Sequence, residues 1–233
     1  MALLELSHVD TYYDDSHILF DLSLTVEAGE VVCLLGRNGS GKTTTVRSII
    51  GLTPPRAGRI TLRGHDLAGL PPFRIARLGI GFVPEDRRIF ADLTVWENLD
   101  VASRRRARDG WTVERVIDLF PKLGELAGRA GGFLSGGEQQ MLTIARTLMG
   151  NPELLLLDEP SEGLAPMVVE HMKTQIARLK AQGLTILLAE QNVGFCLDLA
   201  DRVYVLEKGE IRYRGSAREF SQDESIRHQY LAL

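Results

Sequence analysis

The octapeptide Gly36-Arg37-Asn38-Gly39-Ser40-Gly41-Lys42-Thr43 matches the phosphate-loop pattern at each of its fixed positions. An apolar run at Val31–Leu35 precedes it and a helical pattern at residues 44–50 follows it, which is the context that the pattern requires. Its glycines let successive backbone N–H groups point at phosphate oxygens. Lys42 is placed to neutralise β- and γ-phosphate oxygens, and the Thr43 hydroxyl is placed to ligate Mg²⁺. The sequence therefore predicts a nucleotide-binding α/β fold.

Four leucines at residues 154–157 lead into a pair of acidic residues, Asp158 and Glu159. At the tip of a strand, Asp158 is placed to hold the Mg²⁺ shell, and Glu159 to orient or deprotonate an attacking water. By itself such a run is more typical of a buried strand that ends at the solvent. Combined with a phosphate loop in the same chain, it indicates a nucleotide hydrolase.

Four runs that are apolar at nearly every position predict strands covered on both faces, as in a parallel sheet flanked by helices. They span residues 31–35, 154–157, 185–189 and 203–206. Each ends at a glycine or an acidic residue. Open α/β sheets bind their ligands at this carboxyl edge of the strands.

Two further regions differ from this core. Residues 4–9, 23–26 and 59–62 alternate between apolar and polar, which predicts a small antiparallel sheet at the N-terminal side. Residues from about 94 to 150 carry only helical patterns, so we expect a helical subdomain inserted into one domain that spans residues 1–233.

The segment Leu134-Ser135-Gly136-Gly137-Glu138-Gln139-Gln140 predicts a second anion site. Ser135 and Glu138 have the spacing of a capping box, the same as Thr94 and Glu97, and the glycines leave the backbone amides of the first helical turn bare. A helix N-terminus of this kind binds anions. Since the chain already has a phosphate loop, the second site must serve a phosphate held elsewhere.

Composition limits the alternatives. The chain has 233 residues and a formal net charge of −4, so it has no overall attraction for nucleic acid or an anionic membrane. The two cysteines, Cys33 and Cys196, lie in apolar surroundings and are expected to be buried, reduced thiols in a reducing cytoplasm. A signal peptide is not expected, and the apolar runs are shorter than the ~20 residues that a membrane helix needs.

The phosphate loop, residues 134–140 and Asp158-Glu159, in this order, resemble the nucleotide-binding subunits of ATP-binding cassette (ABC) transporters over the whole chain. The resemblance implies an ABC cassette that binds ATP and Mg²⁺ and works as a head-to-tail dimer. Residues 134–140, which match the family's signature segment, would then face the ATP that the other cassette holds. Tyr13 matches the aromatic residue that stacks on adenine, with Tyr12 as the rival. The implied nucleotide contacts are Tyr13, Gly36, Arg37, Asn38, Gly39, Ser40, Gly41, Lys42, Thr43, Thr44, Ser135, Gly136, Gly137 and Glu138.

Two positions depart from the general family pattern. Glu85 stands where the family usually has a glutamine, and Gln191 stands where it usually has a histidine. Glutamine cannot accept a proton near neutral pH, but its amide can donate to a phosphate oxygen. The implied catalytic residues are therefore Lys42, Glu85, Glu159 and Gln191, with Glu159 as the base. The implied metal ligands are Thr43, Glu85 and Asp158.

The departures themselves resemble one subgroup, the ATPases of bacterial importers for branched-chain amino acids. The loop Ser161-Glu162-Gly163-Leu164-Ala165-Pro166 accompanies Glu85 and Gln191 in this resemblance. Its first four residues match the family's loop after the catalytic glutamate, which crosses the dimer interface. Importers of urea and short amides are closely similar. This resemblance implies integral-membrane permease subunits, a second identical or related ATPase subunit and, indirectly, a periplasmic solute-binding protein. It also implies a peripheral location at the cytoplasmic face of the bacterial inner membrane.

Alternatives of other kinds are a soluble cassette that remodels nucleic acid or protein complexes and a regulatory subunit that does not hydrolyse ATP. The basic cluster at residues 104–108 lacks interleaved aromatic residues, so we expect a solvated loop and no nucleic-acid partner. Phe90 is expected in a groove that receives a short helix of a membrane subunit. Leu93 and Trp96 fit either that groove or ordinary core packing.

Overall fold

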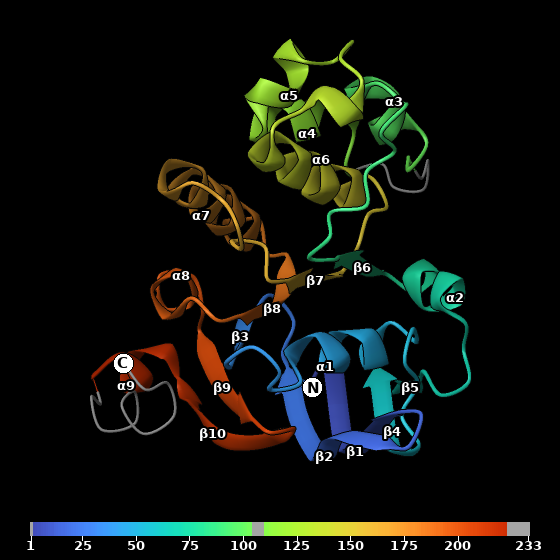
Figure 1. Ribbon diagram of the computed structural model, residues 1–233, viewed down its shortest axis with the longest axis vertical. Helices are drawn as coiled ribbons and strands as arrows, with labels where there is room; N and C mark the ends of the chain where they lie inside the picture. The colour runs from blue at the N-terminus through green and yellow to red at the C-terminus, as the bar shows by residue number, and fades with distance from the viewer. Residues whose placement is uncertain (1, 104–109, 223–233) are drawn as a thin grey trace.

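Six strands form the central sheet, in the order β10-β9-β3-β8-β7-β6 (Figure 1). The computed structural model describes residues 2–103 and 110–222. The strands are β3 (Val31–Leu35), β6 (Ile80–Val83), β7 (Leu154–Asp158), β8 (Thr185–Glu190), β9 (Arg202–Glu207) and β10 (Glu210–Ser216). All neighbours pair in parallel except β10, which is antiparallel to β9. The predicted parallel core is confirmed, and β6 and β10 are added to it.

The central strands are buried on both faces because each face packs against a different apolar cluster. In β3, Val31, Cys33 and Leu35 belong to one cluster, and Val32 and Leu34 belong to the other. This division follows from the two-residue period of a strand, whose successive side chains point to opposite faces.

A second, four-stranded sheet has the order β2-β1-β4-β5 and is antiparallel throughout. Its strands are β1 (Leu4–Tyr13), β2 (Ser16–Val26), β4 (Ala57–Leu62) and β5 (His65–Asp66). Helix α1 (Lys42–Ile49) contributes Val46 and Ile49 to the cluster that also holds apolar residues of both sheets. The predicted antiparallel flank is confirmed, and α1 lies between it and the central sheet (Figure 1).

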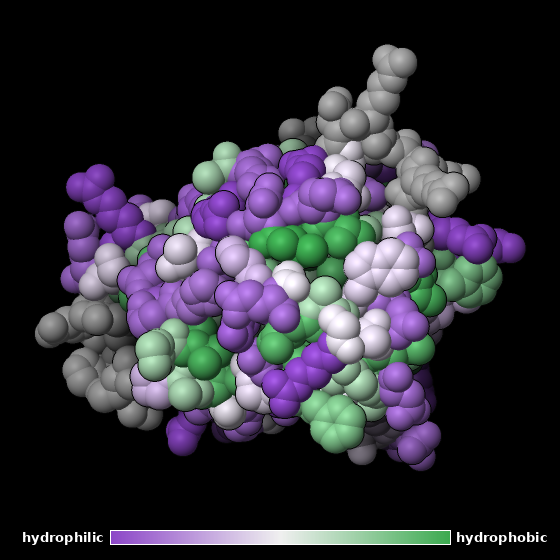
Figure 2. Space-filling view, turned by 90° about the horizontal axis from the view of Figure 1, so that it is seen from above, coloured by the Kyte–Doolittle hydropathy of each residue, from purple (hydrophilic) through white to green (hydrophobic). Residues whose placement is uncertain are grey.

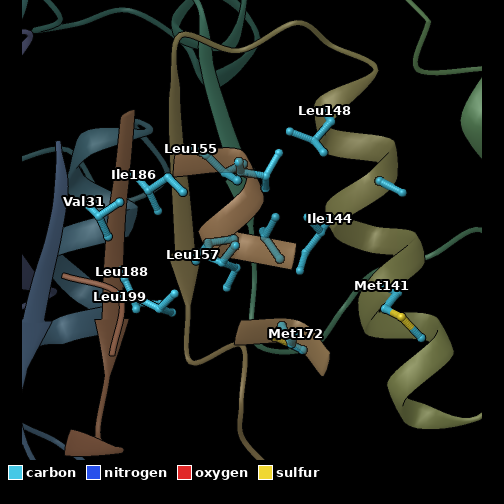
Figure 3. Close-up of a cluster of buried hydrophobic side chains, with 14 of the residues drawn as sticks. Val31, Met141, Ile144, Leu148, Leu155, Leu157, Met172, Ile186, Leu188 and Leu199 are labelled. Atoms are coloured by element: carbon cyan, nitrogen blue, oxygen red, sulfur yellow. The ribbon is translucent and has the colours of Figure 1, made fainter. Parts of the chain in front are cut away.

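The described residues between 95 and 148, which are 95–103 and 110–148, contain helices that lie at one end of the molecule, at the top of Figure 1. They are α3 (Val95–Asp100), α4 (Val113–Leu119), α5 (Pro121–Glu125), the 3-10 turn η1 (Gly131–Phe133) and α6 (Gly136–Leu148). Helix α6 directs Met141, Ile144 and Leu148 at the apolar side chains of β7, among them Leu155 and Leu157 (Figure 3). The basic cluster at residues 104–108 lies outside the described residues.

The remaining helices are α2 (Pro72–Arg77), α7 (Pro166–Ala181), α8 (Val193–Leu197) and α9 (Ala217–Gln222). Within the two described ranges, no helix has the length and apolar character that a membrane crossing needs.

The expectation of two reduced thiols is wrong for this structure, in which Cys33 and Cys196 form a disulfide. Their Cα atoms are 6.0 Å apart although 163 residues separate them in the chain. Cys33 points from β3 into the same apolar cluster that receives Cys196 from α8. The packing of α8 against β3 brings the two sulfurs together, and no local pattern in the sequence predicts this disulfide.

Candidate functional site

The phosphate loop connects the carboxyl end of β3 to α1, and two of its glycines are required by geometry. A Cβ on Gly36 would lie 2.4 Å from Ser40 Oγ and 2.5 Å from the Leu206 carbonyl oxygen. Gly41, directly before α1, has a φ of 112°, in the region that favours glycine. Arg37, Asn38 and Gly39 form the exposed tip of the loop. The loop therefore folds as a tight cradle with its backbone exposed.

Lys42 has its ammonium group inside this cradle and is only 3% exposed. Its Nζ donates to the carbonyl oxygens of Gly36 (2.8 Å) and Arg37 (3.0 Å) and lies 3.1 Å from Glu159 Oε1. The buried Ser40 Oγ has no hydrogen-bond partner within residues 2–103 and 110–222. A buried cation at a bare backbone turn and a buried hydroxyl left without a partner fit a bound phosphate.

Thr43, in the first turn of α1, and Asp158, the last residue of β7, are in contact. Thr43 Oγ1 donates to Asp158 Oδ1 at 3.0 Å, and Asp158 is 1% exposed. Burial raises the pKa of Asp158 to about 6, while the hydrogen bond from Thr43 lowers it. The carboxylates of Glu159 and Glu85 raise the pKa of Asp158 further. A buried carboxylate and the hydroxyl that donates to it form a pair of oxygen ligands that suits Mg²⁺.

Glu159 follows directly, at the end of β7, in a left-handed backbone conformation with φ 45°. Its N–H donates to the Ala189 carbonyl at 2.9 Å, so neighbouring β8 fixes its position. Hydrogen bonding to Glu159 raises the pKa of Glu162 to about 7, with burial as the second cause. Glu162 belongs to the loop at residues 161–166 that the sequence pattern singled out, but it was not among the predicted site residues.

Tyr13 lines a cleft of about 240 Å³ at the phosphate loop, together with Lys42, Thr43 and Glu159. Tyr13 is 38% exposed. Tyr12 is engaged elsewhere, because it stacks on His17 with ring centroids 4.1 Å apart. The structure therefore places Tyr13, not its rival, beside the phosphate loop.

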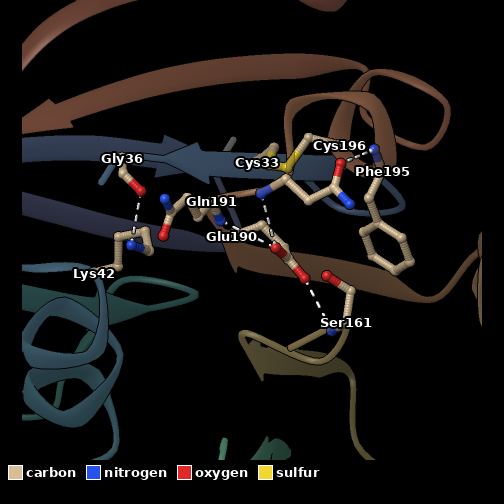
Figure 4. Close-up of a disulfide and its surroundings, with 9 residues drawn as sticks. Cys33, Gly36, Lys42, Ser161, Glu190, Gln191, Phe195 and Cys196 are labelled. Carbon is tan, nitrogen blue, oxygen red and sulfur yellow. Dashed lines mark hydrogen bonds between the residues drawn. A yellow bond between two sulfur atoms is a disulfide. The ribbon is translucent and has the colours of Figure 1, made fainter. Parts of the chain in front are cut away.

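Glu85 and Gln191 end two other strands of the same sheet. Glu85 follows β6 and is exposed, and its effect on the pKa of Asp158 places it within electrostatic range of that carboxyl. Gln191 follows β8 and is also exposed, and its side chain points toward the phosphate loop (Figure 4). Four strand ends thus converge on one edge of the sheet.

Ser135 caps α6 in the predicted capping box. Its N–H donates to Glu138 Oε2 at 2.8 Å, and the Glu138 N–H donates to Ser135 Oγ at 3.4 Å. Neither residue is among those that line the cleft at Tyr13. Gly136 packs against the guanidinium of Arg87, and Gly137 is buried. The structure therefore keeps residues 135–138 apart from the phosphate loop of the same chain.

Comparison with known sequences identifies this arrangement. The sequence profile of the ABC transporter family matches residues 19–162. This chain belongs to the ABC transporter family. It is an ATP-hydrolysing cassette of that family, with the α/β architecture that its sequence predicts.

Curated relatives of this ABC cassette match it from end to end. The high-affinity branched-chain amino acid transport ATP-binding protein BraG of Pseudomonas aeruginosa is 42% identical and covers 98% of this chain and 99% of its own. A probable branched-chain amino acid transport ATP-binding protein LivF of Archaeoglobus fulgidus is 37% identical, with 92% of both chains covered. The lipopolysaccharide export system ATP-binding protein LptB of Escherichia coli is also 37% identical, covering 99% and 98%.

Solved structures agree with this assignment. A nucleotide-free ATP-binding cassette from an ABC transporter superposes with a TM-score of 0.83 at 26% identity, with 97% of each chain covered. A dimeric cassette in a post-hydrolysis state, bound to ADP and Pi, gives a TM-score of 0.80 at 25% identity. It covers 92% of this chain and 99% of its own.

Proposed function

We propose that this ABC cassette powers the import of branched-chain or other hydrophobic amino acids. The observation that carries the substrate class is the end-to-end similarity to BraG, at 42% identity. The Ser161–Pro166 loop and Gln191 support the same subgroup. Similarity to LptB keeps lipopolysaccharide export as the second candidate, and importers of urea or short amides form a third.

ATP would bind with its adenine on Tyr13 and its phosphates in the cradle of residues 36–44. Lys42, now held by two backbone carbonyls and Glu159, is positioned to exchange these contacts for β- and γ-phosphate oxygens. Thr43 and Asp158 would hold Mg²⁺, with Glu85 as a further candidate. When bound, Mg²⁺ neutralises charge on the phosphate oxygens.

Glu159 is the proposed base. Its carboxylate lies at the end of β7, next to Lys42, and is 9% exposed. Gln191 would donate its amide to the γ-phosphate from the end of β8 and leave proton transfer to Glu159. Positioning and neutralisation of charge lower the barrier, as is general for phosphoryl transfer.

Dimerisation completes the proposed site. Because residues 135–138 lie apart from the phosphate loop of their own chain, they remain available to a phosphate in a partner cassette. Ser135, Gly136 and Gly137 would contact the partner's ATP, with the helix N-terminus of α6 adding favourable charge. A related cassette bound to ADP and Pi is dimeric, which supports this arrangement.

The proposed contact with membrane subunits is a cleft of about 490 Å³ between the central sheet and the helical region. Phe82, Phe90, Val101 and Arg146 are among its lining residues. The guanidinium of Arg146 lies 4.7 Å from the ring centroid of Phe90, which remains 50% exposed. Figure 2, which views the molecule from the helical end, shows apolar side chains exposed among polar ones. We propose that a short helix of a permease subunit binds in this cleft.

The Glu159→Gln variant tests the ATPase mechanism. We expect ATP binding to persist, turnover to fall by about 100-fold or more, and a nucleotide-bound dimer to accumulate. Glu170→Gln, an exposed glutamate on α7, is the control and should keep wild-type turnover. Full hydrolysis by Glu159→Gln would contradict its role as base. Uptake of labelled leucine, urea and other solutes by cells with and without the chain would then identify the transported class.

A further inference from the structure

Glu190, the last residue of β8, is a buried carboxylate that the roles described so far do not use. It is 2% exposed and receives three backbone hydrogen bonds (Figure 4). The Ser161 N–H donates to its Oε1 at 3.0 Å. The N–H groups of Gln191 and Asn192 donate to its Oε2 at 3.0 and 3.1 Å.

These donors belong to two separate loops of the site. Ser161 lies two residues after Glu159, at the start of the loop that the proposed dimer places at its interface. Gln191 is the proposed amide donor to the γ-phosphate, and Asn192 caps α8 by accepting from the Phe195 N–H at 3.0 Å. The backbone carbonyl of Glu190 also accepts from Gly36 N–H at 3.3 Å, which ties it to the phosphate loop. Glu190 therefore contacts the phosphate loop, the loop after Glu159 and the loop that begins at Gln191.

The carboxylate is suited to this task because both of its oxygens accept. Burying it is unfavourable unless hydrogen bonds replace its hydration, and three N–H groups do so. In turn, the carboxylate accepts from the N–H groups of Ser161, Gln191 and Asn192, which lie beyond the ends of β7 and β8 and have no partner in the sheet. A fully satisfied buried network of this kind is rigid.

We propose that Glu190 is a positioning residue for ATP hydrolysis, which makes the loop after Glu159 and the backbone of Gln191 move as one unit. This inference rests on the proposed ATPase mechanism. Glu190 touches no reacting atom and acts through Gln191 and Ser161. A displacement of Ser161 when the two cassettes close would thereby be passed to Gln191.

Steady-state ATPase kinetics of Glu190→Gln test the proposal. The new amide group turns N–H toward one of the backbone donors, so one link is lost while the volume is kept. We expect kcat to fall about tenfold, with KM for ATP within about twofold of wild type because Lys42 and Tyr13 are untouched. In a Gln191→Ala background, the same change should cost less than about twofold, because residues that act as a unit are not additive.

Controls separate positioning from general destabilisation. Glu30→Gln removes another partly buried carboxylate, which accepts from Glu27 N–H and Arg202 at the opposite edge of the sheet. It should lower the melting temperature and leave kcat unchanged. If Glu190→Gln does not fold, Glu190→Asp keeps the charge but shortens the reach and should show the same loss of kcat.

The proposal is overturned by an unchanged kcat, by a rise in KM alone, or by an equal loss of kcat with and without Gln191. Failure of the proposed ATPase mechanism has a different signature. In that case the wild-type chain itself fails to hydrolyse ATP, or Glu159→Gln hydrolyses it fully, and the inference about Glu190 falls with it.

Discussion

The carboxylates around Lys42 show how the surroundings of a side chain change its pKa. Asp158, buried at a strand end, has its pKa raised to about 6, and Glu162, bonded to Glu159, has its pKa raised to about 7. Lys42 is the cation in direct contact with Glu159. The carboxylates outnumber this cation, so a divalent cation beside Asp158 is favoured, because it stabilises the ionised form of the carboxylates.

Asp158→Asn is expected to stabilise the chain when nucleotide and Mg²⁺ are absent. The folded pKa of Asp158 lies above its ordinary value of 3.8, so its ionisation opposes folding. This cost appears as pH rises from about 4 to 6 and is complete above that window. It amounts to up to about 3 kcal/mol, at about 1.4 kcal/mol per unit of pKa. The asparagine can still accept from Thr43.

Thermal unfolding in EDTA between pH 4 and 8 measures this effect. The variant should unfold at higher temperature than wild type at pH 7.5, and the difference should vanish near pH 4. Asp92→Asn, at an exposed aspartate, should follow wild type throughout. A difference that is independent of pH would contradict the assigned cause.

Among the helices, α3 and α6 begin with the same arrangement of hydrogen bonds. Thr94 with Glu97 caps α3, and Ser135 with Glu138 caps α6, each through a complete capping box. The capping hydrogen bonds are the same in both helices. Any functional difference between the two helix N-termini therefore comes from their positions in the fold.

Ser135→Ala and Thr94→Ala form a matched pair. Each should lower the free energy of unfolding by about 1 kcal/mol through loss of the cap, measured by urea unfolding. Only Ser135→Ala should also reduce ATPase activity, because Ser135 is the proposed contact to the partner's γ-phosphate. Equal ATPase activity in the two variants would contradict the trans contact.

The disulfide between β3 and α8 joins two other elements of the site. A cross-link across 163 residues restricts the unfolded chain strongly, worth about 5 kcal/mol in the chain-entropy description. Reductant should therefore lower the melting temperature. Because both cysteines are in the disulfide, unreduced protein should show no titratable thiol after denaturation. Cys196→Ser should melt at one temperature with and without reductant. Two titratable thiols in unreduced protein would instead favour the expectation from composition.

At the scale of the whole molecule, the site lies at one edge of the central sheet and the cleft at Phe90 lies toward the helical end. The segment that links the site to the cleft is short, because β6 ends at Val83 and Phe90 follows seven residues later. Glu85 lies within this segment. Movement of a membrane subunit in the cleft would reach Glu85 through this segment.

Phe90→Ala should weaken the association with membrane subunits. The lost ring would remove the apolar contact and the partner of Arg146, so co-purification with co-expressed permease subunits should fall at least about fivefold. Phe73→Ala is the matched control, because Phe73 is 56% exposed and also lies beneath an arginine, Arg77. Equal losses in both variants would contradict a specific role for the cleft.

Much of the fold followed from local patterns. The apolar runs, the phosphate loop and both capping boxes were predicted at their observed positions, because each depends on residues close in sequence. Strands β5, β6 and β10 were missed. β5 has only two residues, β6 is a four-residue stretch that contains Gly81, and β10 is partly exposed and mixes polar with apolar residues. The roles of the site residues remain proposals, but the structure does bring Thr43 to Asp158 and Lys42 to Glu159.

The class of the molecule can be predicted from three short motifs, because the chemistry of each depends on residues that are close together in the chain: the phosphate loop, residues 134–140 and the Asp158-Glu159 pair. Three other features became visible in the folded chain: Tyr13 and not Tyr12 lines the cleft, Cys33 meets Cys196, and the Glu190 carboxylate accepts from both Ser161 and Gln191. Each of these outcomes joins residues far apart in the chain or depends on which face of a strand is turned inward. Such contacts are fixed by the packing of strands and helices, which local patterns do not specify.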